Sequence, residues 1–251
     1  MSGLIESGMS ARSVNRKVAS LSTFFKLMAR KGIVKSGRLN SISKPKQAKT
    51  LPVFFDEDKL NRYLSENDGK KFSGGYEESR DAAIVELLYA TGMRVGELVN
   101  LKVDDADFSG KKIKVTGKRN KQRFIPMIPT SEKALKKYLV EREKFVSVTE
   151  NKFLFLTSKG NKIYEKAVYL IVRNRMTAAG FSGKRSPHVM RHSFATHILN
   201  NGAELNGVKE ILGHAGLAAT QVYTHNTFEK LKKDHARAHP RAQTINRQKD
   251  I

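Results

Sequence analysis

The segment LGHAGLAATQVYTH, residues 212–225, places one tyrosine and two histidines in an otherwise small and apolar stretch. A tyrosine hydroxyl can form a covalent intermediate, but its ordinary pKa near 10 leaves only about one molecule in a thousand ionised at pH 7. Cationic side chains beside it would lower that pKa. Tyr223 is therefore either a packing residue or a nucleophile, depending on which cations the fold brings to it.

A second candidate group lies in SPHVMRHSFATHILNNG, where His188 and Arg191 share one face of a predicted helix. The two side chains could face a phosphodiester, although a packed histidine beside a surface arginine is equally consistent with this pattern alone. A zinc site is disfavoured, because HVMRH lacks the glutamate of the H-E-x-x-H motif and the chain has no cysteine. We expect no metal ion here.

Other parts of the chain supply further cations. Arg94 follows the Gly92 turn in ATGMRVGEL, and its forked guanidinium suits two phosphate oxygens at once. Lys118 lies at the predicted tip of a β-hairpin, from which a side chain can reach into a DNA groove. Taken singly, each could be a solvated surface residue. The candidates for additional DNA contacts are Arg12, Arg16, Lys17, Arg119, Lys121 and Arg123.

The composition favours a polyanionic partner. The 251 residues include 47 Lys and Arg against 24 Asp and Glu, a formal net charge of +23 that is spread along the chain. An RNA-binding protein could share this charge, so it does not define the chemistry. The absence of cysteine excludes disulfides and a cysteine nucleophile. Without a signal peptide or a run of roughly 20 apolar residues, we expect a cytoplasmic protein with no membrane segment.

The chain divides into two predicted units, residues 1–48 and 49–251. The first contains an amphipathic helix with Ser10 as its N-cap and Gly32 as its end, followed by a polar linker punctuated by Pro45 and Pro52. One long helix cannot easily bury a core alone. We therefore expect this segment to be part of a larger domain or to depend on a partner.

The second unit is predicted to be mainly α (an α+β fold) with one small antiparallel sheet. Asp56 can cap a helix that runs to about Glu66, a loop covers residues 68–79, and residues 80–92 form a buried helix. Residues 111–129 alternate as a β-hairpin, and FLFLT at 153–157 is a third strand candidate. Further helices are predicted at about 131–145, 164–179, 187–200, 204–212, 217–224 and 227–236.

Four segments resemble successive signatures of the tyrosine recombinase (phage integrase) family, and those of the bacterial Xer recombinases most closely. They are LLYATGMRVGELVNL, VTGKRNKQRFIPM, SPHVMRHSFATHILNNGAELNGVKEILGH and LAATQVYTH, in the family's order and at similar spacing. The resemblance covers roughly residues 10–240. It implies an active site made of Arg94, Lys118, His188, Arg191, His214 and Tyr223.

The resemblance also implies a division of roles. Tyr223 would attack a DNA phosphorus, the two arginines would stabilise charge on the non-bridging oxygens, and Lys118 would protonate the leaving 5′-oxygen. His188 is then a candidate to accept the tyrosine proton, and His214 a candidate to donate a hydrogen bond to the phosphate. These groups replace what a metal would otherwise supply, so no metal ion or other cofactor is expected.

The family implies double-stranded DNA as partner and a homotetramer or heterotetramer on synapsed sites, associated with the nucleoid. Resolution of chromosome or plasmid dimers and integration of mobile elements are the expected tasks. A type IB topoisomerase and a DNA-binding module that no longer cuts are the alternatives, disfavoured by the Xer-like VKEILGH segment and by the filled catalytic positions.

Two features depart from the family. Ala219 and Thr220 stand where a Thr-Thr pair is commoner, which leaves every catalytic position filled. The N-terminal segment matches only the last helix of the family's helical, SAM-like core-binding domain. We therefore expect residues 1–48 to represent a partial domain.

Overall fold

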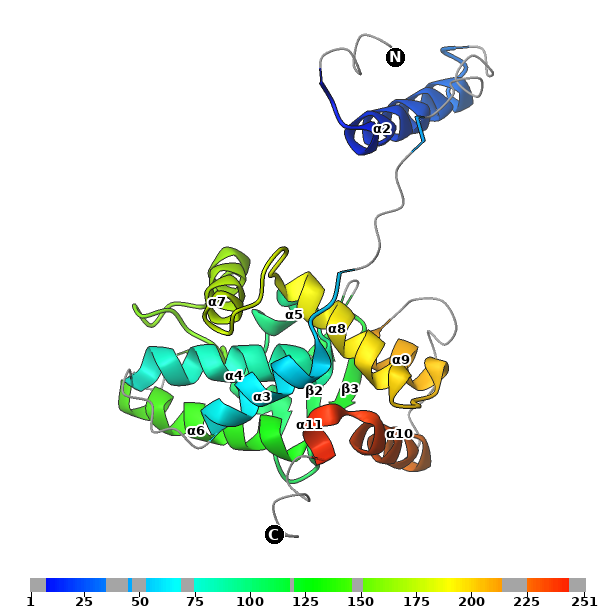
Figure 1. The fold of residues 1–251 in the computed structure, drawn as a ribbon. Coiled ribbons are helices and arrows are strands. Elements are labelled where there is room, and N and C mark those ends of the chain that lie inside the picture. The colour runs from blue at the N-terminus through cyan, green and yellow to red at the C-terminus, as the bar shows by residue number, and fades with distance from the viewer. Residues whose placement is uncertain are drawn as a thin grey trace. The chain divides into compact units, whose positions relative to one another are not determined.

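The computed structural model describes residues 8–34, 45–46, 53–68, 75–117, 120–145, 151–213 and 225–243 (Figure 1). The chain separates into two compact units, Met1–Leu51 and Pro52–Ile251.

The first unit contains helix α2, Ala11–Arg30. It begins as predicted, with the Ser10 hydroxyl accepting a hydrogen bond from the Ser13 amide (3.3 Å), and the left-handed Gly32 follows its end. Val14 and Val18 are buried. Four large apolar side chains nevertheless remain exposed on this helix: Leu21, Phe24, Phe25 and Leu27.

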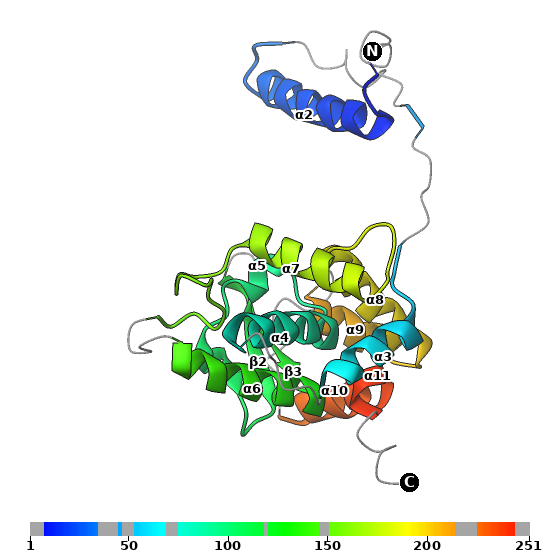
Figure 2. The ribbon, with the colours of Figure 1, turned by 60° about the vertical axis from the view of Figure 1, so that its left-hand side comes forward.

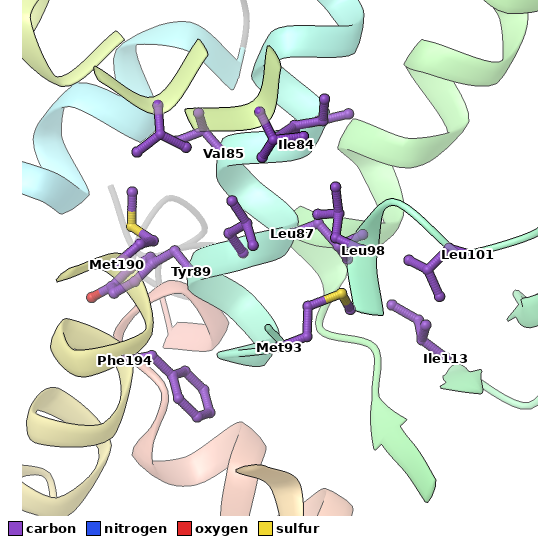
Figure 3. Close-up of a cluster of buried hydrophobic side chains, with 14 of the residues drawn as sticks. Ile84, Val85, Leu87, Tyr89, Met93, Leu98, Leu101, Ile113, Met190 and Phe194 are labelled. Carbon is purple, nitrogen blue, oxygen red and sulfur yellow. The ribbon is translucent and has the colours of Figure 1, made fainter. Parts of the chain in front are cut away.

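Helix α4, Gly75–Thr91, is the centre of the second unit. It packs against α6 (Pro129–Phe145), α7 (Glu165–Ala178) and α8 (Pro187–Asn200), and Figures 1 and 2 both show it between α6 and α7. Because neighbours surround it, α4 is apolar on nearly all sides rather than along one stripe. Figure 3 shows Leu87 and Tyr89 of α4 among core side chains contributed by several elements, including Met93, Leu98, Ile113 and Phe194.

The described part of the sheet has three antiparallel strands in the order β1-β2-β3. These are β1 (Ala106–Asp107), β2 (Lys112–Thr116) and β3 (Gln122–Pro126), with Ile113 opposite Ile125 and Val115 opposite Arg123. The predicted hairpin is confirmed, since β2 and β3 pair along their whole length. A short 3-10 turn, Val103–Asp105, leads into β1.

The prediction that FLFLT forms a strand is wrong. The segment makes only isolated bridges, Lys102 with Phe153 and Leu156 with Lys162, and β1 is the third strand of the sheet instead. Its three central residues, 154–156, are all buried, without the alternation of a strand at the edge of a sheet. An apolar run of this length can cross a core as an extended segment without joining a ladder.

The other helices begin and end close to the predicted positions. Asp56 caps α3 (Glu57–Asp68) through a 2.8 Å hydrogen bond from the Lys59 amide, and α4 starts about one turn before the predicted residue 80. The predicted helix 217–224 lies outside the described residues. None of the helices within the described ranges is long and apolar enough to cross a bilayer. The remaining elements are α5 (Val95–Leu98), α9 (Leu205–Leu212), α10 (His225–Ala238) and α11 (Pro240–Gln243).

The C-terminal helices form part of the core. α10 is slightly longer than the predicted 227–236, and its Leu231 and Ala238 are buried. Arg241 of α11 is fully buried, where it pairs with Glu86 of α4 (3.1 Å) and donates to Ser65 of α3 (2.7 Å). The last turn is therefore fixed by a buried ion pair as well as by packing.

Two buried histidines make the stability of this packing depend on pH. His235 Nε2 donates to Ala90 O (3.0 Å), and its Nδ1 has no hydrogen-bond partner among the described residues. Burial lowers the pKa of His235 to about 4, and burial followed by the charge of His235 lowers the pKa of His239 well below its usual value. In the unfolded chain these histidines take up protons near pH 6.5, whereas in the folded chain they stay neutral. The free energy of unfolding is therefore at its full value above about pH 6.5 and falls as the pH drops towards 4.

We expect His235→Gln to flatten this dependence, because glutamine can still donate to Ala90 O but does not titrate. Urea unfolding at pH 7.5 and pH 5 should show that the variant avoids about 2 kcal/mol of the loss seen in the unmodified chain. The exposed His188, replaced by glutamine, is the control and should retain the full dependence. If the free energy of unfolding of His235→Gln falls as much between pH 7.5 and pH 5 as that of the unmodified chain, another group is responsible for the pH dependence.

Candidate active site

Arg94 is held at the start of α5, immediately after a sharp turn. Gly92 has a left-handed backbone (φ 58°), and a Cβ there would lie 2.3 Å from Phe194 Cδ1 and 2.9 Å from Leu212 Cδ2. Only glycine allows α4, α8 and α9 to meet this closely. The turn exposes 42% of the Arg94 side chain, so its guanidinium borders both solvent and core.

Arg191 reaches the same point from α8. Its Nη1 donates to Gly92 O (2.6 Å) and its Nη2 to Leu212 O (2.8 Å), which is also within 3.5 Å of Arg94 Nη1. Burial, and then the nearby charge of Arg94, lowers the pKa of Arg191 to about 10. It remains protonated at neutral pH. The structure thus brings the two predicted arginines together at one backbone carbonyl.

Glu97 binds Arg94 from the next turn of the chain. Its carboxylate accepts from the Arg94 amide (Oε2, 2.8 Å) and from Arg94 Nη1 (Oε1, 3.1 Å). Burial alone would raise the pKa of Glu97, but hydrogen bonds and charge from Arg123, together with Arg94, hold it below its usual value. A buried, ionised Glu97 therefore fixes the position of Arg94.

The C-terminus of α9 collects all three arginine side chains. Arg123 Nε donates to Ile211 O (2.7 Å), while Arg191 and Arg94 approach Leu212 O. The carbonyls that end a helix carry partial negative charge, which favours cations there. Three guanidinium groups and one carboxylate leave a surplus of positive charge at the exposed side of Arg94. Such a cluster suits a phosphodiester, whose two non-bridging oxygens match a guanidinium fork.

His188 lies in the first turn of α8, one turn before Arg191, and its side chain is exposed. It is therefore open to a ligand placed against the arginines. Lys118, Arg119, His214 and Tyr223 lie outside the described residues. Their described neighbours are Gly117 at the end of β2, Gly213 at the end of α9 and α10, which begins at His225.

The predicted DNA contacts divide into exposed and buried positions. Arg12, Arg16 and Lys17 are exposed on α2, and Lys121 is exposed before β3. Arg123 is only 7% exposed, and its guanidinium donates to Glu97 and to Ile211 O. This burial argues against the prediction that Arg123 contacts DNA. The alternating pattern of the hairpin could have placed residue 123 on the inward face.

Sequence reasoning missed Glu97. The signal was present, since a glutamate three residues after the start of a short helix commonly accepts from the backbone amide of the cap residue. Arg94 and Glu97 have this spacing.

Comparison with known proteins agrees with this arrangement. The profile of the phage integrase family matches residues 54–230. The tyrosine recombinase XerC of Oceanobacillus iheyensis is 37% identical over 245 residues, which cover 96% of this chain and 79% of that protein. The tyrosine recombinase XerD of Listeria monocytogenes serotype 4b is 40% identical over 243 residues, 94% of this chain and 79% of that protein.

Among solved structures, the XerH site-specific recombinase bound to difH substrate in a pre-cleavage complex aligns with a TM-score of 0.67 and 27% identity, covering 90% of this chain and 65% of that one. The XerA recombinase aligns with a TM-score of 0.58 and 28% identity, covering 92% and 78%. With a family match over most of its length and relatives of this identity, the chain belongs to the phage integrase family, as a tyrosine recombinase.

Proposed function

We propose that this site-specific recombinase cuts and rejoins double-stranded DNA through a 3′-phosphotyrosyl link formed by Tyr223. The observation that supports it best is the convergence of Arg94 and Arg191 on Leu212 O, which aims two guanidinium groups at one small region. A phosphate bound there would present its non-bridging oxygens to both arginines. Removing one preorganised donor of this kind typically slows a reaction about 10²- to 10³-fold.

The other candidate residues have complementary roles in the proposal. Lys118 protonates the leaving 5′-oxygen, His188 accepts the proton of Tyr223, and His214 orients the phosphate by a hydrogen bond. The phosphotyrosyl link conserves the energy of the broken bond, so religation needs no ATP. Charge stabilisation comes from side chains that the protein holds in place, and so the reaction should proceed in EDTA.

The wider context follows from the relatives. Two of the similar solved structures are of the XerH site-specific recombinase bound to its difH substrate, which supports DNA as the partner of this chain. We propose that the active assembly is a homotetramer or heterotetramer on two synapsed sites. Resolving chromosome or plasmid dimers is the task that best fits the similarity to XerC and XerD, which would place the protein on the nucleoid. None of the similar proteins named above favours the topoisomerase alternative.

A capture experiment tests the proposal and identifies the target sequence at the same time. The chain is incubated in EDTA with nicked fragments of its own genome, the proteins are denatured, and DNA bound covalently to protein is sequenced. We expect enrichment of one sequence composed of two inverted half-sites. Absence of covalent capture would contradict the phosphotyrosyl mechanism.

The captured site then separates recombination from relaxation. Two copies are placed in direct repeat on a supercoiled plasmid, with a one-copy plasmid as the matched control. A recombinase converts the two-copy plasmid into two smaller circles. Relaxation of both plasmids without strand exchange would instead support a topoisomerase-like activity.

A further inference from the structure

We propose that Arg123 is a positioning residue for the recombination reaction, acting through Glu97 on Arg94 and through the end of α9. This rests on the proposed function, and the test below separates the two. Arg123 does not border solvent as Arg94 does, so it acts on the phosphate indirectly.

The guanidinium of Arg123 joins two elements that are distant in sequence. Its Nη1 and Nη2 each donate to one oxygen of Glu97 (both 2.9 Å), and its Nε donates to Ile211 O (2.7 Å). Such a planar fork fixes both the distance and the orientation of a carboxylate, which a lysine cannot do. β3, α5 and α9 are thereby tied together.

Arg123 also determines how much of the positive charge of Arg94 is available to a bound phosphate. Glu97 is the carboxylate that both Arg94 and Arg123 contact. With Arg123 present, the three side chains together carry one positive charge, and Arg94 can offer it to a phosphate. Without Arg123, the buried Glu97 would retain Arg94 as its partner. The pair would then be neutral overall, and its attraction for the transition state would be weaker.

Two glycines show that the Glu97 and Arg123 pair lies between two catalytic segments. A Cβ on Gly213, which has a left-handed φ of 66°, would lie 3.0 Å from Arg123 Nη1. A Cβ on Gly117 would lie 3.4 Å from Glu97 Oε1. Gly117 directly precedes Lys118, and Gly213 directly precedes His214. The ion pair is therefore packed against the described ends of both segments that carry these candidates.

The test compares Arg123→Lys with the unmodified chain on two nicked substrates. One has a normal phosphodiester at the cleavage position, and the other a methylphosphonate, in which a methyl group replaces one charged oxygen. Less negative charge develops there, so cleavage depends less on Arg94. We expect formation of the covalent complex to slow by about 10- to 10²-fold on the phosphodiester and clearly less on the methylphosphonate. The ratio of the two rates is independent of the fraction of folded protein.

Arg142→Lys is the matched control. Arg142 is as deeply buried as Arg123, but it donates to Asn151 O and Phe153 O, away from the arginine cluster. Its replacement should lower the melting temperature while leaving the ratio of the two rates unchanged. DNA affinity and its salt dependence should be unaffected by Arg123→Lys, since a phosphate contact would change the salt slope by about 0.9.

A second variant keeps the proposal testable if Arg123→Lys folds poorly. The double variant Glu97→Met/Arg123→Met replaces the buried ion pair by apolar side chains, an exchange that often preserves stability. Restored melting temperature with a slow phosphodiester reaction supports the positioning role. Restoration of both the melting temperature and the phosphodiester rate in the double variant would falsify the positioning role. An equal loss of rate on the two substrates in Arg123→Lys would do the same. If the unmodified chain itself forms no covalent complex, the proposed function fails instead.

Discussion

Replacing Tyr223 with phenylalanine should abolish covalent attachment to DNA while leaving DNA binding intact. Phenylalanine keeps the ring and removes only the hydroxyl oxygen that attacks phosphorus. The expected fall in covalent complex is complete. A denaturing gel of the protein with nicked, labelled DNA in EDTA measures it directly, because a phosphotyrosyl link survives denaturation and shifts the labelled strand.

Tyr164, which is exposed at the start of α7, provides the control. Tyr164→Phe removes a hydroxyl of the same type from a residue with no predicted catalytic role and should leave the shifted band unchanged. Native gels with unnicked DNA check that both variants still bind. A shifted band of normal intensity in Tyr223→Phe would mean that another residue attacks the DNA.

The elements that the sequence predicted well are those with a strong local signal. Ser10 and Asp56 both cap helices through their side chains, and the alternation within residues 111–129 gave a paired hairpin. The resemblance to tyrosine recombinases led to the same fold class, mainly α with a small antiparallel sheet. Periodicity and capping are properties of short segments, so they can be read without knowing the tertiary structure.

The errors arose where tertiary contacts decide the structure. FLFLT has the composition of a strand, but its backbone passes through the core beside Leu101 and Ile163 without joining the sheet. The tail was predicted to form a short helix over about 227–236, followed by a polar end. In the structure α10 and α11 bury Leu231, His239 and Arg241. Deleting residues 227–251 would therefore remove core side chains, and not only a segment available to a neighbouring protomer.

For a similar reason, only part of the candidate site could be predicted from the sequence. Arg94 and Arg191 are recognisable from the motifs, and the structure brings them together at Leu212 O. Glu97 and Arg123 lie within the same motifs, but the sequence alone does not pair them. Their importance depends on a contact between residues 26 positions apart in the chain, and on the carbonyls at the end of α9. Pairings of this kind are set by the packing of β3 against α5 and α9.

Lys118→Ala and Arg191→Ala should both slow cleavage strongly, but only the lysine variant should be rescued by a better leaving group. Each loss is expected to be on the order of 10²- to 10³-fold, from a missing proton donor in one case and a missing transition-state donor in the other. In a 5′-thio substrate the leaving group is a thiolate, which departs readily without a proton. Cleavage of this substrate therefore does not need Lys118. The thiolate does not replace the contact of Arg191 with the non-bridging oxygens.

Arg191→Ala also has a structural cost that the measurement must separate. Arg191 donates to Gly92 O and Leu212 O, so its removal leaves two carbonyls without that donor and should destabilise the fold by roughly 1 to 3 kcal/mol. Single-turnover rates on the 5′-thio and 5′-oxygen substrates are therefore compared as a ratio, in which the fraction of folded protein cancels. The ratio should rise steeply for Lys118→Ala and remain that of the unmodified chain for Arg191→Ala. An equal rise of this ratio in both variants would contradict the assignment of Lys118 to the leaving oxygen and of Arg191 to the non-bridging oxygens.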